Sequence, residues 1–379
     1  MTVSHRRRSN GEGSIYPAAD GRLRGAILIT NPLTGEQLRR YVSGRSRADV
    51  VRKLDALRND AASGNYANGE TTRDYLARWL VAVKPRLRPS TYLESVRHVE
   101  SYFGPAIGSI PLSRLTPADV ERAMAGLLAR GYSPQTVQHA RSTLRRALHD
   151  AERHGLLIRN VAALARPPRA QRREMRPLTA AEVRTLLDST AAEPMGPLFE
   201  VAVGTGLRLG ELLGLRWTDI GDKALTVRRS LARADGGGWA MAEPKTARSR
   251  RTVMLPAIAV DGLRRQRERQ DADRSAASTA WQDRGGLVFT DAVGRHLHPT
   301  AVSHAFRLAA DRLGLTGVRL HDLRHTAATL MLGAGVPLKV VSEALGHSSI
   351  GITADVYAHV TPELRREAAD AMDRALNDA

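Results

Sequence analysis

Ionisable side chains of complementary chemistry lie close together in the last quarter of the sequence. His321 and Arg324 are three residues apart in HDLRH, which places them on one face of a helix. His347 follows in LGH, and Tyr357 lies in TADVYAH. A phenol among cations can attack phosphorus, because positive charge stabilises both the phenolate and the phosphoryl oxygens. The pattern therefore predicts phosphoryl transfer with a tyrosine nucleophile.

Glycine and proline indicate the helices that would hold these groups. Gly333 and Gly335 are expected to end the helix that carries Arg324, and Pro337 is expected to begin the next one. A second turn at Gly346 then precedes the tyrosine segment. Upstream, TGLRLGELLGLRW is interpreted as helix, glycine break and helix, rather than as a dinucleotide fingerprint, because its third glycine comes one place late and no strand precedes it.

That upstream segment adds Arg208 at the start of a helix, with Glu211 one turn later as a partner that orients Arg208 or as a simple neighbour. Lys245 follows near the expected tip of a hairpin and is one of five lysines among 57 cationic residues. An ammonium group can give up a proton when nearby cations lower its pKa, whereas a guanidinium group cannot. Lys245 is therefore predicted to be a general acid, and a lysine present by chance is the alternative.

The segments HDLRH, LGH, TADVYAH, TGLRLGELLGLRW and EPKTARSRR occur in an order that resembles the catalytic boxes of tyrosine recombinases, the phage integrase family. The resemblance implies that Tyr357 attacks a DNA phosphodiester and forms a 3′-phosphotyrosine link, while Lys245 protonates the departing 5′-oxygen to a hydroxyl. Arg208 and Arg324 would clamp the phosphate, since a guanidinium fork matches two phosphoryl oxygens. No cofactor is expected, because one phosphodiester replaces another.

His321 and His347 would donate hydrogen bonds to the phosphate or carry the proton of the nucleophile. A metal site at His321 and His325 is the alternative, but the string HDLRH lacks the glutamate of HExxH. We expect His325 to pack within the helix and expect no metal site.

Composition supports a nucleic-acid partner. The 379 residues include 57 Lys+Arg and 39 Asp+Glu, a net charge of +18, which favours a polyanion over the alternative of an inert basic surface. The absence of cysteine excludes disulfides, thiolate catalysis and cysteine-ligated zinc. Without an apolar run of signal-peptide or transmembrane type, the expectation is a soluble protein of the bacterial cytoplasm, associated with the nucleoid.

The fold is expected to be mainly α with small β elements. Residues 1–66 predict three short strands and a helix that begins after Ser46, with Val50, Val51, Leu54 and Leu57 on its apolar face. Arginines at polar positions of this sheet suit entry into the major groove, and the resemblance implies an arm-site DNA-binding domain; a structural cap is the alternative. These candidate DNA-binding residues are Arg22, Arg24, Arg39 and Arg40.

Residues 70–165 predict a helical bundle, in which Thr116-Pro117 and Ser133-Pro134 begin helices. Arg141 and Arg145 would lie outside the bundle and contact DNA, as in the core-binding domain of the family. A basic linker, residues 166–177, leads to a mixed α+β catalytic domain, residues 178–379, whose strands are ALTVRRSL, GGGWAMAEP and RRTVML and whose last part is helical from Pro299.

An apolar stripe in residues 362–379 predicts a tail helix that docks on a neighbouring protomer, or alternatively within its own chain. The expected partners are double-stranded DNA at core and arm attachment sites, three further copies in a homo-tetramer, a DNA-bending protein and a directionality factor, but no membrane. Integration or excision of a phage or mobile element is the predicted function. A type IB topoisomerase and a non-catalytic DNA-binding regulator are the alternatives, the latter because residues 335–359 also fit a helix-turn-helix.

Overall fold

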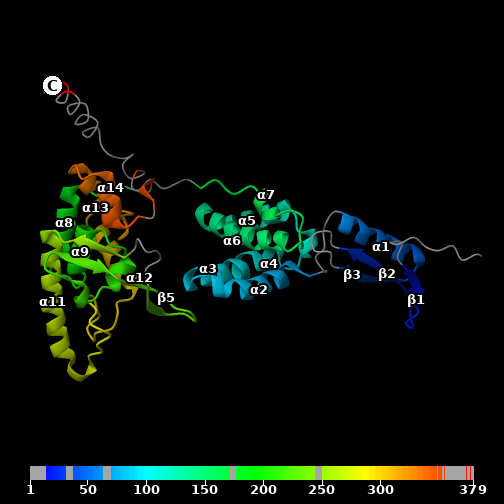
Figure 1. The fold of residues 1–379 in the computed structure, drawn as a ribbon, viewed down its shortest axis with the longest axis horizontal. Helices are drawn as coiled ribbons and strands as arrows, with labels where there is room; N and C mark the ends of the chain where they lie inside the picture. The colour runs from blue at the N-terminus through cyan, green and yellow to red at the C-terminus, as the bar shows by residue number, and fades with distance from the viewer. Residues whose placement is uncertain are drawn as a thin grey trace, which may run out of the picture. The chain divides into compact units, whose positions relative to one another are not determined.

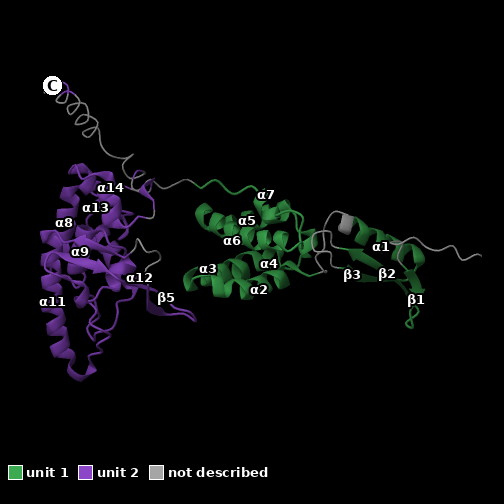
Figure 2. Ribbon diagram, in the orientation of Figure 1, with its two compact units in different colours: residues 1–172 green, residues 173–379 purple. Residues whose placement is uncertain are grey.

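A computed structural model describes residues 14–30, 37–62, 70–170, 176–243, 250–347, 349–351, 354, 373 and 376. The chain divides into two compact units, residues 1–172 and 173–379 (Figures 1 and 2). Both are described below by themselves. The fold is mainly helical with small antiparallel sheets, as predicted. Within the described ranges, no helix combines the length and apolar character needed to cross a membrane.

The first unit begins with a three-stranded antiparallel sheet in the order β1-β2-β3, covered on one face by helix α1. Ile27 of the central strand packs against Val50 and Leu54 of the helix. The predicted three strands and helix are confirmed, except that Val51 is 39% exposed, because it lies outside the stripe that Val50 and Leu54 form four residues apart. The bounds are β1 Ser14–Pro17, β2 Leu23–Thr30, β3 Gln37–Gly44 and α1 Arg47–Ala62.

The register of this sheet separates its arginines between two faces. A Cβ at Gly25 would lie within 3 Å of Val50 and Leu54, so the alternation of the strand places Arg24 on the face away from α1. Arg39 pairs with Leu28 on that same open face, whereas Arg40 pairs with Ile27 on the face that α1 covers. Arg22 precedes β2 and is exposed.

A helical bundle forms the rest of the first unit (Figure 1). The predicted starts are confirmed, since Thr116 and Ser133 cap helices whose first residue is proline. Arg141 donates a hydrogen bond to the Ala163 carbonyl at 3.0 Å, while Arg145 is exposed. The bounds are α2 Thr72–Val83, α3 Pro89–Arg97, a π-helical segment His98–Phe103, α4 Gly104–Ile107, α5 Pro117–Ala129, α6 Pro134–Arg153 and α7 Val161–Leu164, with 3₁₀ turns at Lys84–Arg86 and Leu112–Arg114.

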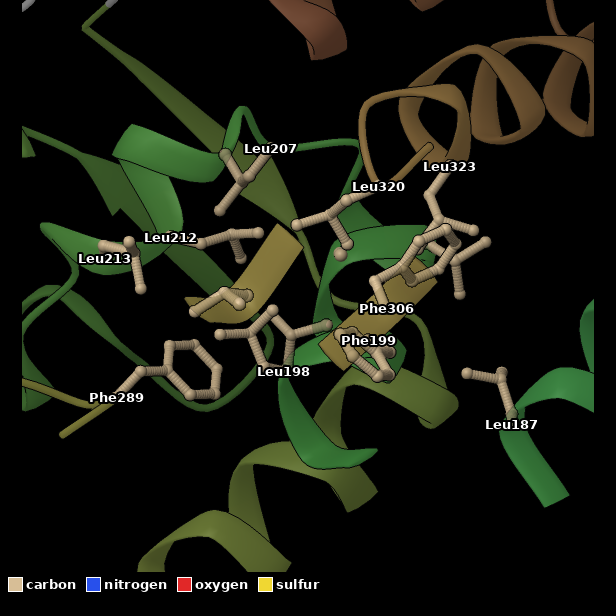
Figure 3. Packing of buried hydrophobic residues seen from close by; sticks show 14 of the residues in the cluster. Leu187, Leu198, Phe199, Leu207, Leu212, Leu213, Phe289, Phe306, Leu320 and Leu323 are labelled. Atoms are coloured by element: carbon tan, nitrogen blue, oxygen red, sulfur yellow. The ribbon is translucent and has the colours of Figure 1, made fainter. Parts of the chain in front are cut away.

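The second unit packs helices around α9, Gly196–Thr205. Phe199 of α9 meets Phe306 edge-on with ring centroids 5.3 Å apart, at the centre of the packing in Figure 3. A capping box of Thr179 and Glu182 begins α8. The other helices are α8 Ala180–Thr190, α10 Leu209–Leu213, α11 Ala257–Ala277, α12 Pro299–Arg312, α13 Asp322–Gly333 and α14 Leu338–Leu345, with 3₁₀ turns at Trp217–Asp219 and Ser278–Ala280.

Two small sheets complete this unit, and they correct one prediction. The stretch ALTVRRSL is two strands rather than one, because β4 pairs with β7 while β5 pairs with β6. Between β4 and β5, Arg229 turns toward the buried Asp219 and forms an ion pair at 2.6 Å. The bounds are β4 Ala224–Val227, β5 Ser230–Arg233, β6 Trp239–Ala242 and β7 Arg251–Met254.

Candidate active site

The glycine break after α9 places Arg208 at the start of α10, as predicted. Gly206 has φ +62° and lies so close to Leu345 that a Cβ would approach its Cδ2 to 2.3 Å. Only glycine combines this left-handed backbone with this close approach. The break therefore brings the start of α10 against the end of α14.

Arg324 lies in the first turn of α13 and is 3% exposed. Its guanidinium donates to the Gly206 carbonyl at 2.7 Å through Nη1 and to the Leu345 carbonyl at 2.6 Å through Nη2. Burial, followed by the charge of Arg208, lowers the pKa of Arg324 to about 9, which leaves it protonated at neutral pH. A fixed positive charge is thus held between α9, α13 and α14.

The end of α14 is bound by three arginines, each from a different element. Carbonyl groups at a helix C-terminus carry partial negative charge and lack intrahelical partners, so cations stabilise them. The three hydrogen bonds run from Arg251 Nε to the Ala344 oxygen at 2.8 Å, from Arg324 Nη2 to the Leu345 oxygen at 2.6 Å, and from Arg208 Nη2 to the Gly346 oxygen at 3.2 Å.

Glu211 connects two of these arginines. Its buried carboxylate accepts from Arg208 Nη1 at 2.9 Å and from Arg251 Nη2 at 3.0 Å, and it also accepts from the backbone N–H of Arg208 at 3.0 Å. Burial by itself would raise the pKa of Glu211, but hydrogen bonding and charge, first from Arg251 and then from Arg208, outweigh it and lower the pKa. Glu211 is therefore ionised and holds Arg208 in place.

Two histidines border the arginines. His321 occupies the N-cap position of α13 and meets the ring of His325 edge-on at 5.1 Å, and His347 is buried directly after Gly346. Loss of hydration and the neighbouring arginines lower the pKa of His347 to about 4. His321 is more exposed, but loss of hydration and the charges of His325 and Arg324 also lower its pKa to about 4. Both imidazoles are neutral at pH 7, so each can accept or donate a hydrogen bond.

The pKa of His347 predicts a dependence of stability on pH. The unfolded chain, with the ordinary value of 6.5, binds the proton at higher pH than the folded chain does. Stability should therefore be complete above pH 6.5 and fall as the pH drops toward 4, with about 3 kcal/mol attributable to His347. Urea unfolding at pH 7 and pH 4.5 tests this: His347→Gln should lose less stability on acidification than the wild type, and an equal loss would contradict it.

The other predicted residues fall into two groups. Lys245 and Tyr357 lie outside the described residues. Arg22, Arg24, Arg39, Arg40, Arg141 and Arg145 belong to the other compact unit. Among the residues that the structure describes, no three His, Cys, Asp or Glu side chains gather where they could hold a metal ion.

Arg251 is a member of the cluster that sequence reasoning missed. The sequence shows it as one more arginine in SRR, and the preference of the chain for arginine hides it. Its position at the start of an expected strand was the available signal, since alternation directs one of two successive arginines inward.

Comparisons with known proteins identify the family of this chain. The family model described as "Phage integrase family" matches residues 176–363, and "Phage integrase, N-terminal SAM-like domain" matches residues 71–128. An integrase from Streptomyces ambofaciens is 30% identical over 377 residues, which cover 93% of each chain. The chain belongs to the phage integrase family. It is a tyrosine-type site-specific recombinase, as the sequence predicted.

Other members of the family extend the similarity along the chain. An integrase from Saccharopolyspora erythraea is 26% identical, over 98% of each chain. A solved structure of the Tn1549 transposon integrase in complex with transposon right end DNA has a TM-score of 0.67 at 20% identity and covers 80% of this chain and 99% of that chain. A solved structure of a lambda integrase tetramer bound to a Holliday junction has a TM-score of 0.58 at 20% identity. The match covers 93% of this chain and 96% of that chain. This integrase shares their fold.

Proposed function

We propose that the protein integrates or excises a mobile element by cleaving and rejoining double-stranded DNA through a covalent 3′-phosphotyrosine intermediate. The observation that carries the proposal is the meeting of Arg208, Arg324 and His347 at one helix end, stabilised by Glu211. Positive charge from these side chains is concentrated and fixed there, which suits a phosphodiester whose oxygens gain charge in the transition state. Names of related proteins, such as the Tn1549 transposon integrase, support a mobile element.

Each of these groups has one role in the proposed reaction. The phenol oxygen of Tyr357 attacks phosphorus while the bond from phosphorus to the 5′-oxygen breaks. The phenolic proton passes to a neutral imidazole, and Lys245 protonates the departing oxygen. Arg208 and Arg324 stabilise the phosphoryl oxygens; a guanidinium has five donors, so Arg324 keeps N–H groups beyond its two carbonyl bonds. A 5′-hydroxyl from a partner duplex reverses the step, so phosphodiester bonds are conserved.

The open face of the N-terminal sheet is the proposed arm-binding surface. Arg24 and Arg39 lie on it, beside the exposed Tyr41, and the guanidinium of Arg39 is 5.8 Å from the ring of Tyr41. In the bundle, the exposed Arg145 is a better candidate for DNA contact than Arg141, whose guanidinium binds a carbonyl. A DNA-bending protein and a directionality factor are proposed as further partners.

Neighbouring arginines provide a matched test of this surface. Arg39→Gln is expected to weaken binding to arm DNA about tenfold and to lower the salt dependence of the affinity, because one phosphate contact is lost. Arg40→Gln, on the covered face, should leave the salt dependence unchanged. Fluorescence anisotropy at several salt concentrations measures both, and an equal effect of the two substitutions would contradict the assignment.

Assembly is proposed to be tetrameric on two duplexes, supported by the fold shared with the lambda integrase tetramer. The tail helix proposed to link protomers lies outside the described residues. Recombination between two duplexes that carry the candidate attachment site and its flanks, in EDTA, tests function and assembly together. Recombinant product and sedimentation as four protomers are the expected results. Relaxation of plasmids without the site would instead indicate a type IB topoisomerase, and tight binding without cleavage would indicate a regulator.

A further inference from the structure

Arg251 is the first residue of β7, and its side chain is turned inward. The side chain is 7% exposed and forms a buried ion pair with Glu211, at 3.0 Å from Nη2 to Oε2. Its Nη1 lies 3.3 Å from the other carboxylate oxygen, and its Nε donates to the Ala344 carbonyl. Arg251 thus binds α10 and α14 at once from a third element, the strand.

The preceding arginine shows that this placement is specific. The Arg250 side chain is 59% exposed and pairs with Glu243, which is itself 83% exposed. Exposed pairs of this kind contribute little to stability. Two successive arginines of one segment therefore have opposite environments, and only Arg251 belongs to the cluster.

Close packing around Gly346 fixes the guanidinium further. Gly346 has φ +66°, and a Cβ on it would lie 2.9 Å from Cδ and 3.1 Å from Cζ of Arg251. The Arg251 side chain therefore lies against the backbone that joins α14 to His347. A shift of this side chain would move the contact surface of the turn that carries His347.

Arg251 also begins the pairing of β7 with β4. Its Cα is paired with Val227 of β4. The ion pair with Glu211 therefore joins this sheet to α10, which begins directly after Arg208.

We propose that Arg251 is a positioning residue for DNA cleavage, which holds the Arg208–Glu211 pair and the His347 turn in one arrangement. This inference rests on the proposed function. Stability alone does not explain such a residue, because replacing a buried ion pair by apolar groups of similar volume is often neutral or stabilising. What apolar groups cannot supply is the directed fork that binds a carboxylate and a helix end together.

Single-turnover cleavage of a nicked duplex tests the proposal, with DNA affinity measured in parallel. Arg251→Met keeps the volume of the side chain and is expected to slow cleavage about a hundredfold at saturating protein, since a misplacement of about 1 Å has an effect of that size. Arg251→Lys should be intermediate, because it keeps the charge but not the fork. The matched control Arg250→Met should cleave within about twofold of wild type. DNA affinity should be the same in all four proteins.

A double-mutant cycle separates positioning from unrelated damage. If Arg251 acts through Glu211, the combination of Glu211→Gln with Arg251→Met should cleave no more slowly than the slower single variant. Additive losses, normal cleavage by Arg251→Met, or an equal loss of DNA affinity would overturn the inference. If thermal melting shows that Arg251→Met does not fold, the cleavage rate of Arg251→Lys tests the inference instead, and a rate equal to that of the wild type would overturn it. Absence of covalent product from the wild type would refute the proposed function instead.

Discussion

Replacing Arg324 by lysine is expected to reduce the rate of strand cleavage by about a thousandfold. Arg324 is 3% exposed and satisfies the carbonyls of Gly206 and Leu345 with two separate nitrogens. Lysine keeps the charge, but a single ammonium cannot reach both carbonyls and two phosphoryl oxygens. The loss should therefore exceed what the unchanged charge would suggest.

The same substitution should lower the free energy of unfolding by about 1–3 kcal/mol, because one buried carbonyl loses its donor. Arg319→Lys is the matched control: Arg319 is exposed, lies just before the same helix and pairs with Asp322. Single-turnover cleavage and urea unfolding measure both effects. Cleavage by Arg324→Lys within about tenfold of wild type would show that Arg324 supports the fold and not the phosphate.

Replacing Lys245 by arginine is expected to slow cleavage by a factor of about 10² to 10⁴, as much as replacement by alanine does. The reason is proton transfer: a guanidinium keeps its proton at any pH that the protein tolerates, so an arginine cannot protonate the departing 5′-oxygen. A role in charge alone would predict that arginine restores activity. Lys223→Arg, at an exposed lysine of the same unit, should have no effect and serves as the control.

A substrate with sulfur in place of the 5′-oxygen isolates this step. A thiolate is a good leaving group without protonation, because the pKa of a thiol is near 8.5. Both Lys245 variants should cleave the sulfur substrate at a rate close to that of the wild type. Equal defects on oxygen and sulfur substrates would contradict the general-acid role.

Local signals in the sequence were sufficient to predict much of the fold. Thr116-Pro117 and Ser133-Pro134 begin helices because a side-chain cap and a proline at the first helical position act within a few residues. The glycine break before Arg208 is equally local, since φ +62° at Gly206 needs only the residue type. The apolar face of α6 is also a local signal, because Val137, Ala140, Leu144, Ala147 and Leu148 recur at helical spacing and are buried.

Features that depend on distant contacts were not predictable in the same way. The three arginines bind the end of α14, although the most distant of them, Arg208, lies 138 positions from its partner Gly346 in the chain. Arg251 gave no signal beyond its strand position, and the split between β4 and β5 follows from their pairing with two different strands, β7 and β6. The 21-residue helix α11 was not predicted, because its sequence is largely polar and few of its residues are buried.

The measurement that tests the central claim most directly is covalent capture of DNA by wild type and by Tyr357→Phe. Nicked duplexes that cover the candidate attachment site and its flanks are incubated with each protein in EDTA and separated on denaturing gels. A covalent protein–DNA band from the wild type alone is the expected result, because phenylalanine keeps the ring but removes the attacking oxygen. A band of equal strength from Tyr357→Phe would contradict the account, since another residue would then be the nucleophile.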